Sequence, residues 1–218
     1  MAHERWSRLA PLSGLLFVVV VLVGGPVVTG STPGAHATAS HVIAFYTAHR
    51  ARERAGVILV ALSMIPFVAF AAALRARWRT GRGAEGLSAL MLAAAVLAAA
   101  GVTVNEGVGY ALTDGPSRLS ASTAETLNLL SHDLVLTTAT GMLSFGVVSG
   151  LLVLRARVLP TWLGWSAVVA GLLFVTPIEV VGFAILVVWT SVVAVLLARE
   201  APAPYSSPLS PGVTTPAS

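Results

Sequence analysis

The sequence predicts an all-α, polytopic integral membrane protein: a bundle of six transmembrane helices with one short amphipathic helix on the outer side. Hydrophobic residues make up 56% of the 218 residues and charged residues only 10%, whereas soluble domains carry about 25% charged residues. Six apolar runs approach the roughly 20 residues that a helix needs to cross the hydrocarbon core. The 13 Lys and Arg residues are all Arg, and they cluster between these runs. This composition favours a bilayer environment.

The predicted spans form a single transmembrane domain over residues 1–199. The first run follows Arg5 and Arg8, the second contains Pro66, and a tight turn at Thr176-Pro177 separates the fifth from the sixth. Proline lacks a backbone donor, so we expect a kink in the second span. The approximate bounds of the spans are 9–28, 57–74, 86–112, 126–154, 162–175 and 178–198.

The Arg residues of the short connecting segments predict how the chain is threaded, because cytoplasmic loops retain positive charge. With the N-terminus inside, the inner segments hold nine Arg residues and the outer segments hold four, namely Arg50, Arg52, Arg54 and Arg118. We therefore expect both termini to be cytoplasmic, in a bacterial cytoplasmic membrane. The alternative is that residues 1–37 form a cleaved signal peptide ending at Ala35-His36-Ala37, which would leave five spans in the same orientation.

Two segments are expected outside the bilayer. Residues 200–218 are rich in Pro and Ser, which predicts a disordered cytoplasmic tail. Residues 40–54 place apolar side chains at helical spacing ahead of His49, Arg50, Arg52 and Arg54, which predicts an amphipathic helix on the outer leaflet. We interpret these four basic side chains as contacts to lipid headgroups.

Three stretches carry a resemblance to known proteins. They are RLAPLSGLLFVVVVLVGG at the first span, VIAFYTAHRARERAG before the second, and LPTWLGWSAVVAG at the start of the fifth. Over nearly all of the six-span region, the chain resembles a group of small actinobacterial integral membrane proteins of unknown function. The resemblance implies the same threading. It implies no activity and no catalytic or binding residues.

Ionisable residues in the third and fourth spans are the candidates for function, because such groups are costly in hydrocarbon unless they face protein or water. Glu106 lies near the outer end of the third span, and His132 and Asp133 lie in the outer third of the fourth. At 100° per residue, Asn128 shares a face with His132, whereas Asp133 heads another stripe through Thr137, Thr140 and Ser144. The fourth span is therefore expected in the middle of the bundle.

Two interpretations of this polar cluster stay open. Its members either hydrogen-bond neighbouring helices in a dry interface, or they face a wet pocket that opens to the outer side. Asn105 and Glu179 complete the candidate set, although Glu179 is equally explained as an interfacial carboxylate at a helix N-terminus. His132 and Asp133 lie on different faces of the helix, so they are not expected to act as one unit. We expect Glu106 and Asp133 to be the pair that acts together.

The sequence holds no cysteine, nucleophile elbow, Walker loop or dinucleotide glycine motif, so it gives no support to thiolate, nucleophilic or nucleotide chemistry. We expect a protein that handles a small solute, ion or proton rather than an enzyme. The expected partner is the lipid bilayer. We expect no cofactor and no nucleic-acid partner. One alternative is an accessory subunit that packs against another membrane protein. A second is a metal-dependent membrane hydrolase, with His41, His49 and His132 as candidate ligands. The oligomeric state and the ligand stay open.

Overall fold

The computed structural model describes residues 10–25, 32–79, 84–157 and 159–199, and these are almost entirely helical, with no strand among them. The predicted all-α class is confirmed. Within these described ranges, four stretches are long and apolar enough to cross a membrane. They are α4 (Arg50–Trp78), α5 (Ala84–Asp114), α6 (Ala121–Asp133) together with α7 (Val135–Ala156), and α9 (Glu179–Arg199). Shorter apolar helices run over Ala10–Gly25, which contains α2 (Ser13–Leu22), and over α8 (Thr161–Leu173).

Several predicted features fall outside the described residues. They are residues 9 and 26–28 of the first span, the tail from 200 to 218, and Arg5, Arg8 and Arg82. Within the described part, the second predicted span continues as one helix through Pro66. The fourth predicted span is divided at Leu134 into α6 and α7.

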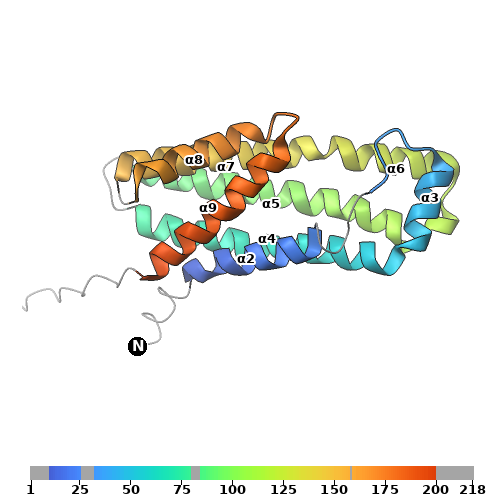
Figure 1. Cartoon of the computed structure of the whole chain (residues 1–218), viewed down its shortest axis with the longest axis horizontal. Helices are drawn as coiled ribbons and strands as arrows, with labels where there is room; N and C mark the ends of the chain where they lie inside the picture. Colours follow the sequence, from blue (N-terminus) through green and yellow to red (C-terminus); the bar gives the residue numbers. More distant parts are fainter. Residues whose placement is uncertain (1–9, 26–31, 80–83, 158, 200–218) are drawn as a thin grey trace, which may run out of the picture.

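Six helices pack in a closed ring, each against the next (Figure 1). The order around the ring is α2, α4, α5, α7, α8 and α9, and α9 returns to α2. A helix that buries apolar residues on one side and exposes them on the other suits such a ring in lipid. α4 follows this pattern, since Phe67 and Phe70 are fully buried whereas Leu62 and Ile65 are exposed.

Aromatic side chains fill the centre of the ring. The ring of Phe67 in α4 lies with its centroid 5.0 Å from that of Phe17 in α2 and 5.0 Å from that of Phe145 in α7. Trp189 of α9 lies edge-on to Phe145 at 6.2 Å and to Phe70 at 6.4 Å. Its indole nitrogen donates a hydrogen bond of 2.8 Å to a backbone carbonyl of α8. These contacts tie five of the six helices together.

Glycine permits the closest helix contacts, which lie on two sides of α7. A Cβ atom on Gly141 would lie 2.4 Å from the backbone nitrogen and Cα of Ala98 in α5. A Cβ atom on Gly150 would lie 2.5 Å from the carbonyl oxygen of Gly164 in α8. Small residues at such contacts let helix backbones approach, which strengthens dispersion between helices in lipid. α7 is therefore held tightly between α5 and α8.

Three helices extend past this ring at one end. Gly24, near the end of the first apolar helix, contacts α4 at Leu59 and Val60, so the preceding part of α4 lies beyond α2. Similarly, Glu179 at the start of α9 lies at the level of Val135, so α6 lies beyond α8 and α9. We call this end the extension. It consists of residues 50–58 of α4, residues 105–114 of α5, and α6.

The extension is closed by α3 (Ala39–Ala48), which lies across its end, and by the short 3-10 helix η3 (Pro116–Arg118), which joins α5 to α6 (Figure 1). The predicted amphipathic helix over residues 40–54 was therefore too long, because the chain turns at His49 and Arg50 begins α4. Val42 and Tyr46 of α3 are buried in one cluster with Leu112 and Ala124. The apolar face of α3 thus packs on α5 and α6, whose ends would otherwise expose apolar surface.

We predict that Gly141→Ala lowers stability, because the new methyl group meets the backbone of α5, which has no rotamer by which to move away. Overpacking of this kind costs about 1–3 kcal/mol. Gly107→Ala, also inside a helix, is the matched control, because a Cβ atom there meets nothing within 4 Å. Thermal unfolding of the protein in detergent can be followed by tryptophan fluorescence. Gly141→Ala should unfold at a lower midpoint temperature than the wild-type protein, whereas Gly107→Ala should not. Equal midpoints for the two variants would contradict the contact between α5 and α7.

Candidate functional site

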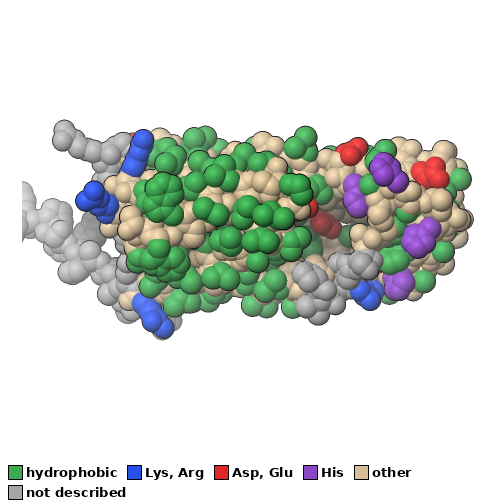
Figure 2. Space-filling model, turned by 45° about the horizontal axis from the view of Figure 1, so that its top comes forward, with side chains coloured by type: hydrophobic (Ala, Val, Ile, Leu, Met, Phe, Trp, Pro, Cys, Tyr) green, Lys and Arg blue, Asp and Glu red, His purple; other side chains and the backbone are tan. Residues whose placement is uncertain are grey.

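A polar cavity of about 240 Å³ lies inside the extension. Figure 2 shows acidic and His side chains gathered at this end of the molecule, next to the apolar surface of the ring. The cavity is walled by α3, α4, α5, α6 and the first residue of α7. Its lining residues are Thr32, Tyr46, Glu53, Val57, Asn105, Glu106, Gly109, Asn128, Ser131, His132 and Val135.

Two carboxyl groups face this cavity, from α4 and from α5. Glu53 is only 1% exposed, and its Oε1 atom has no hydrogen-bond partner among the described residues. Its ion-pair partner, the Nε atom of Arg52, lies 4.0 Å away, beyond hydrogen-bond distance. Glu106, on the neighbouring helix α5, is partly buried and lines the same cavity. Next to it, the buried Oδ1 atom of Asn105 also has no hydrogen-bond partner within the described part of the chain. Buried acceptors of this kind are costly unless a donor reaches them.

Glu53 and Tyr46 are lining residues that the sequence analysis did not single out. The sequence holds a signal for Glu53, because it precedes Gly56, Val57 and Ser63 on the buried stripe of α4 at helical spacing. Because Glu53 lies among the Arg residues of positions 50–54, it looks like part of an exposed charged cluster. Tyr46 is one of the apolar side chains of residues 40–54, which the sequence places on a helix that lies on the outer leaflet. Its role could not be seen without knowing that α3 lies over the cavity.

Tyr46 supplies a hydroxyl group to the cavity wall from α3. Burial raises the pKa of this hydroxyl to about 12, and the nearby carboxyl groups of Glu53 and Glu106 contribute in the same direction. Because a tyrosinate would be both desolvated and close to two acids, the hydroxyl keeps its proton at physiological pH. Tyr46 therefore remains a hydrogen-bond donor beside two carboxyl groups.

Polar side chains of α6 hold the segment that precedes α3. Asn128 donates from Nδ2 to the carbonyl oxygens of Gly34 at 2.9 Å and Ala35 at 3.3 Å. His132 donates from Nε2 to the carbonyl oxygen of Pro33 at 3.0 Å. A carboxylate oxygen of Glu125 accepts from the backbone nitrogen at the start of α3, at 2.9 Å. The predicted shared face of Asn128 and His132 is thus occupied by a connecting segment, and both side chains also reach the cavity.

The predicted pairing of Glu106 with Asp133 was wrong. Asp133 is exposed and does not line the cavity. Thr137 and Thr140, on the same stripe, are exposed as well, and their hydroxyls donate to the carbonyls of Leu134 and Leu136 in their own chain segment. Hydroxyl groups satisfied in this way need no neighbouring helix. α7 is a member of the ring, not its centre, because its close ring neighbours are α5 and α8, and it packs through its glycine and phenylalanine face. The expected place of this span in the middle of the bundle was therefore wrong.

Glu179 lies in a second cavity, of about 310 Å³, which is lined mainly by apolar residues. This cavity is formed by Val135, Thr138, Ala139, Phe174, Glu179, Val180 and Phe183. The structure therefore brings Asn105, Glu106, Asn128 and His132 together in the polar cavity, and it leaves Asp133 and Glu179 outside it.

The basic residues near the start of α4 contact the end of α5. Arg50 donates from Nε to the carbonyl oxygen of Thr113 at 2.9 Å, and it also reaches the carbonyl of Asp114. Arg54 bonds the hydroxyl of Tyr110, lies 4.7 Å over its ring, and pairs with Asp114 at 3.7 Å. The Arg50 guanidinium thus satisfies free carbonyls at the C-terminus of α5, and both positive charges complement the dipole of that helix. Arg50 and Arg54 therefore also bind within the protein, and their contact with lipid headgroups stays a prediction.

His49 and Arg52, the other two predicted headgroup residues, are exposed. The His49 ring packs on Phe45 and donates from Nδ1 to the carbonyl oxygen of Phe45 at 3.0 Å. Lipid contact by His49 and Arg52 stays a prediction. His41 is exposed on α3, and neither His41 nor His49 lines the cavity with His132. Within the described ranges, no three His, Asp or Glu side chains are grouped so that they could hold a metal ion.

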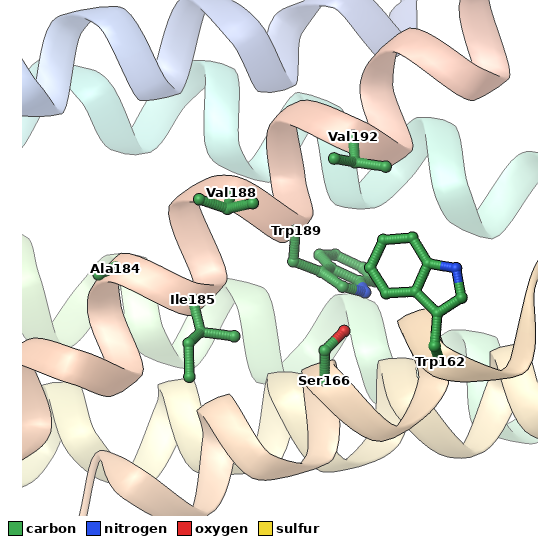
Figure 3. Close-up of a pocket in the computed structure, with 7 residues that line it drawn as sticks. All are labelled: Trp162, Ser166, Ala184, Ile185, Val188, Trp189 and Val192. Atoms are coloured by element: carbon green, nitrogen blue, oxygen red, sulfur yellow. The ribbon is translucent and has the colours of Figure 1, made fainter.

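An apolar groove of about 340 Å³ runs between α8 and α9, on the ring (Figure 3). Trp162 and Ser166 line it from α8, and Val188, Trp189 and Val192 line it from α9. Trp162 and Val188 are more than half exposed. Since the groove offers one hydroxyl and no charged group, its chemistry is that of a surface facing lipid tails.

Comparison of the chain with protein-family models, with curated proteins and with solved structures gave no match.

We predict that the double variant Asn128→Ala with His132→Ala releases the segment over residues 32–39. It removes three side-chain hydrogen bonds, each with a net contribution of about 0.5–1.5 kcal/mol. Hydrogen–deuterium exchange of backbone amides in this segment should therefore accelerate by roughly tenfold or more. Asp133→Ala, a change at the exposed neighbour of His132, should leave the exchange rates unchanged. Unaltered exchange in the double variant would show that these side chains do not hold the segment.

Proposed function

We propose that this chain is an integral membrane protein that binds a small cation or protonated solute in the acidic cavity of its extension. The observation that carries this proposal is that two carboxyl groups, those of Glu53 and Glu106, line one polar cavity, and that the buried Glu53 oxygen has no hydrogen-bond donor among the described residues. An occupant that carries positive charge and donor hydrogens satisfies both the charge and the hydrogen bonds.

The cavity wall offers acceptors because several of its donors are already engaged. Asn128 and His132 donate to carbonyls of the segment that precedes α3. The hydroxyl of Ser131 donates to the carbonyl of Asn128. Once these donors are committed, the groups left for an occupant are mainly the oxygens of the two acids and of Asn105, beside the single hydroxyl donor of Tyr46. This imbalance favours a cation or an ammonium group over an anion or an apolar ligand.

The position of the cavity also supports binding from one side of the membrane. The carboxyl groups lie in the extension, past the ends of α2 and α8, and the ring itself is closed by its aromatic centre. A helix of 29 residues such as α4 is about 43 Å long, whereas the hydrocarbon core is about 30 Å thick. The extension therefore suits the headgroup region, where a solute arrives from water.

The proposed setting is a bacterial cytoplasmic membrane with six spans, both termini in the cytoplasm and the cavity on the opposite side. Six Arg residues lie in the last turn of α4, α7 and α9 or directly after it, at the end of the ring away from the extension: Arg75, Arg77, Arg79, Arg155, Arg157 and Arg199. Clusters of Arg at one end support that end as the cytoplasmic one. The resemblance to actinobacterial membrane proteins supports the same threading.

We predict saturable binding of radiolabelled methylammonium to the wild-type protein in lipid nanodiscs, with competition by sodium or potassium if simple cations share the site. Glu53→Gln and Glu106→Gln should each weaken methylammonium binding by at least about tenfold, because each removes the charge of one wall. Both substitutions keep the size of the side chain, so the cavity keeps its shape.

Asp133→Asn is the matched control, since it removes an exposed carboxyl group outside the cavity and should leave methylammonium affinity unchanged. The proposal fails if the folded wild-type protein binds none of methylammonium, sodium and potassium above empty nanodiscs. It also fails if Asp133→Asn weakens binding as much as the two cavity variants do.

A further inference from the structure

The polar cavity and the second cavity meet at one residue, Val135, which lines both. Along α6 and α7, the residues that line the polar cavity are Asn128, Ser131, His132 and Val135. The second cavity continues the same helical spacing through Thr138 and Ala139. The face that carries these residues runs from α6 across the division at Leu134 into the first turns of α7, with the polar cavity at one end and the largely apolar cavity at the other.

The two cavities differ in chemistry. The second cavity has a wall of aromatic and aliphatic side chains, Phe174, Val180 and Phe183. Val180 is 74% exposed on the outside of the ring, so the cavity borders the surface that faces lipid tails. Its polar contributors are Glu179 and the buried hydroxyl of Thr138, which has no hydrogen-bond partner among the described residues. A ligand that occupies both cavities therefore needs a charged head and an apolar body.

We propose that the ligand class of this site is an amphiphilic amine, whose ammonium group lies between Glu53 and Glu106 and whose hydrocarbon chain passes Val135 into the cavity of Phe174, Val180 and Phe183. This inference rests on the proposed function, because it requires that the acidic cavity bind a cation. It goes further by assigning the second cavity to the same ligand. Charge complementarity orients the ligand, since the paired carboxyl groups face the polar cavity and the second cavity presents apolar walls.

The test compares methylammonium, butylammonium and hexylammonium in equilibrium binding to the full chain in nanodiscs, with empty nanodiscs subtracted to remove partition into lipid. Burying each methylene group should tighten binding by about fourfold. Hexylammonium should therefore bind the wild-type protein far more tightly than methylammonium does. Glu53→Gln and Glu106→Gln should weaken the binding of all three amines.

Two variants test whether the hydrocarbon chain of the amine lies in the second cavity. Val135→Phe narrows the junction between the cavities and should abolish the gain from a longer hydrocarbon chain, so that hexylammonium binds this variant no more tightly than methylammonium does. Val180→Asn puts a polar group in the apolar wall at an exposed position, where folding is unaffected, and should weaken hexylammonium binding by about tenfold. Val181→Asn, at an exposed neighbouring position outside the cavity lining, is the matched control and should bind hexylammonium as wild type does.

The outcomes separate this inference from the proposed function. Binding of methylammonium with no gain for hexylammonium overturns the amphiphilic ligand and leaves the cation site standing. Tighter binding of 1,6-diaminohexane than of hexylammonium also overturns it, because a second charge would then be favoured near Glu179. If Val181→Asn weakens hexylammonium as much as Val180→Asn, the assigned chain position is wrong. Failure of all the amines to bind removes the proposed function and this inference together.

Discussion

The structure depends on a difference in helix length. α4 and α5 have 29 and 31 residues, which corresponds to about 43 and 46 Å, and α6 with α7 is longer still. Their neighbours α2, α8 and α9 have 10, 13 and 21 residues. Three helices therefore project beyond a ring of six. Projecting helix ends expose apolar side chains and free backbone carbonyls. In the extension, α3 covers the apolar side chains of Leu112 and Ala124, and Arg50 donates hydrogen bonds to the last carbonyls of α5.

The acidic cavity follows from the same projection. In the ring, aromatic and glycine contacts bring the helices close together, whereas in the extension α2, α8 and α9 are absent and the space is closed by one short helix and a connecting segment. The polar groups of α6 are used to hold that segment, which leaves Glu53, Asn105 and Glu106 with acceptors directed at a shared cavity. The architecture that stabilises the extension is thus also what gives the cavity its excess of acceptors.

Periodicity and composition predicted the helices and the separation of His132 from Asp133, because both depend on local helical geometry. They could not predict that Asp133 is exposed or that Glu53 is buried, because these depend on which helices lie beside each face. The division of the fourth predicted span at Leu134, and the end of α3 at His49, were also missed, since hydropathy does not report where a helix leaves the ring. Asn128 and His132 were correctly assigned to one face, yet their partner, the segment from Pro33 to Ala35, is nearly 100 residues away in sequence.

The central claim is that Glu53 and Glu106 contact a cationic ligand directly. Infrared difference spectroscopy of the protein in lipid, with and without methylammonium, tests it most directly because carboxyl stretching bands report the environment of these groups. We expect ligand-induced changes in the carboxyl region of the spectrum, and Glu53→Gln and Glu106→Gln should each remove part of these changes. Methylammonium binding without any carboxyl band change, or with a change that survives in both variants, would contradict it.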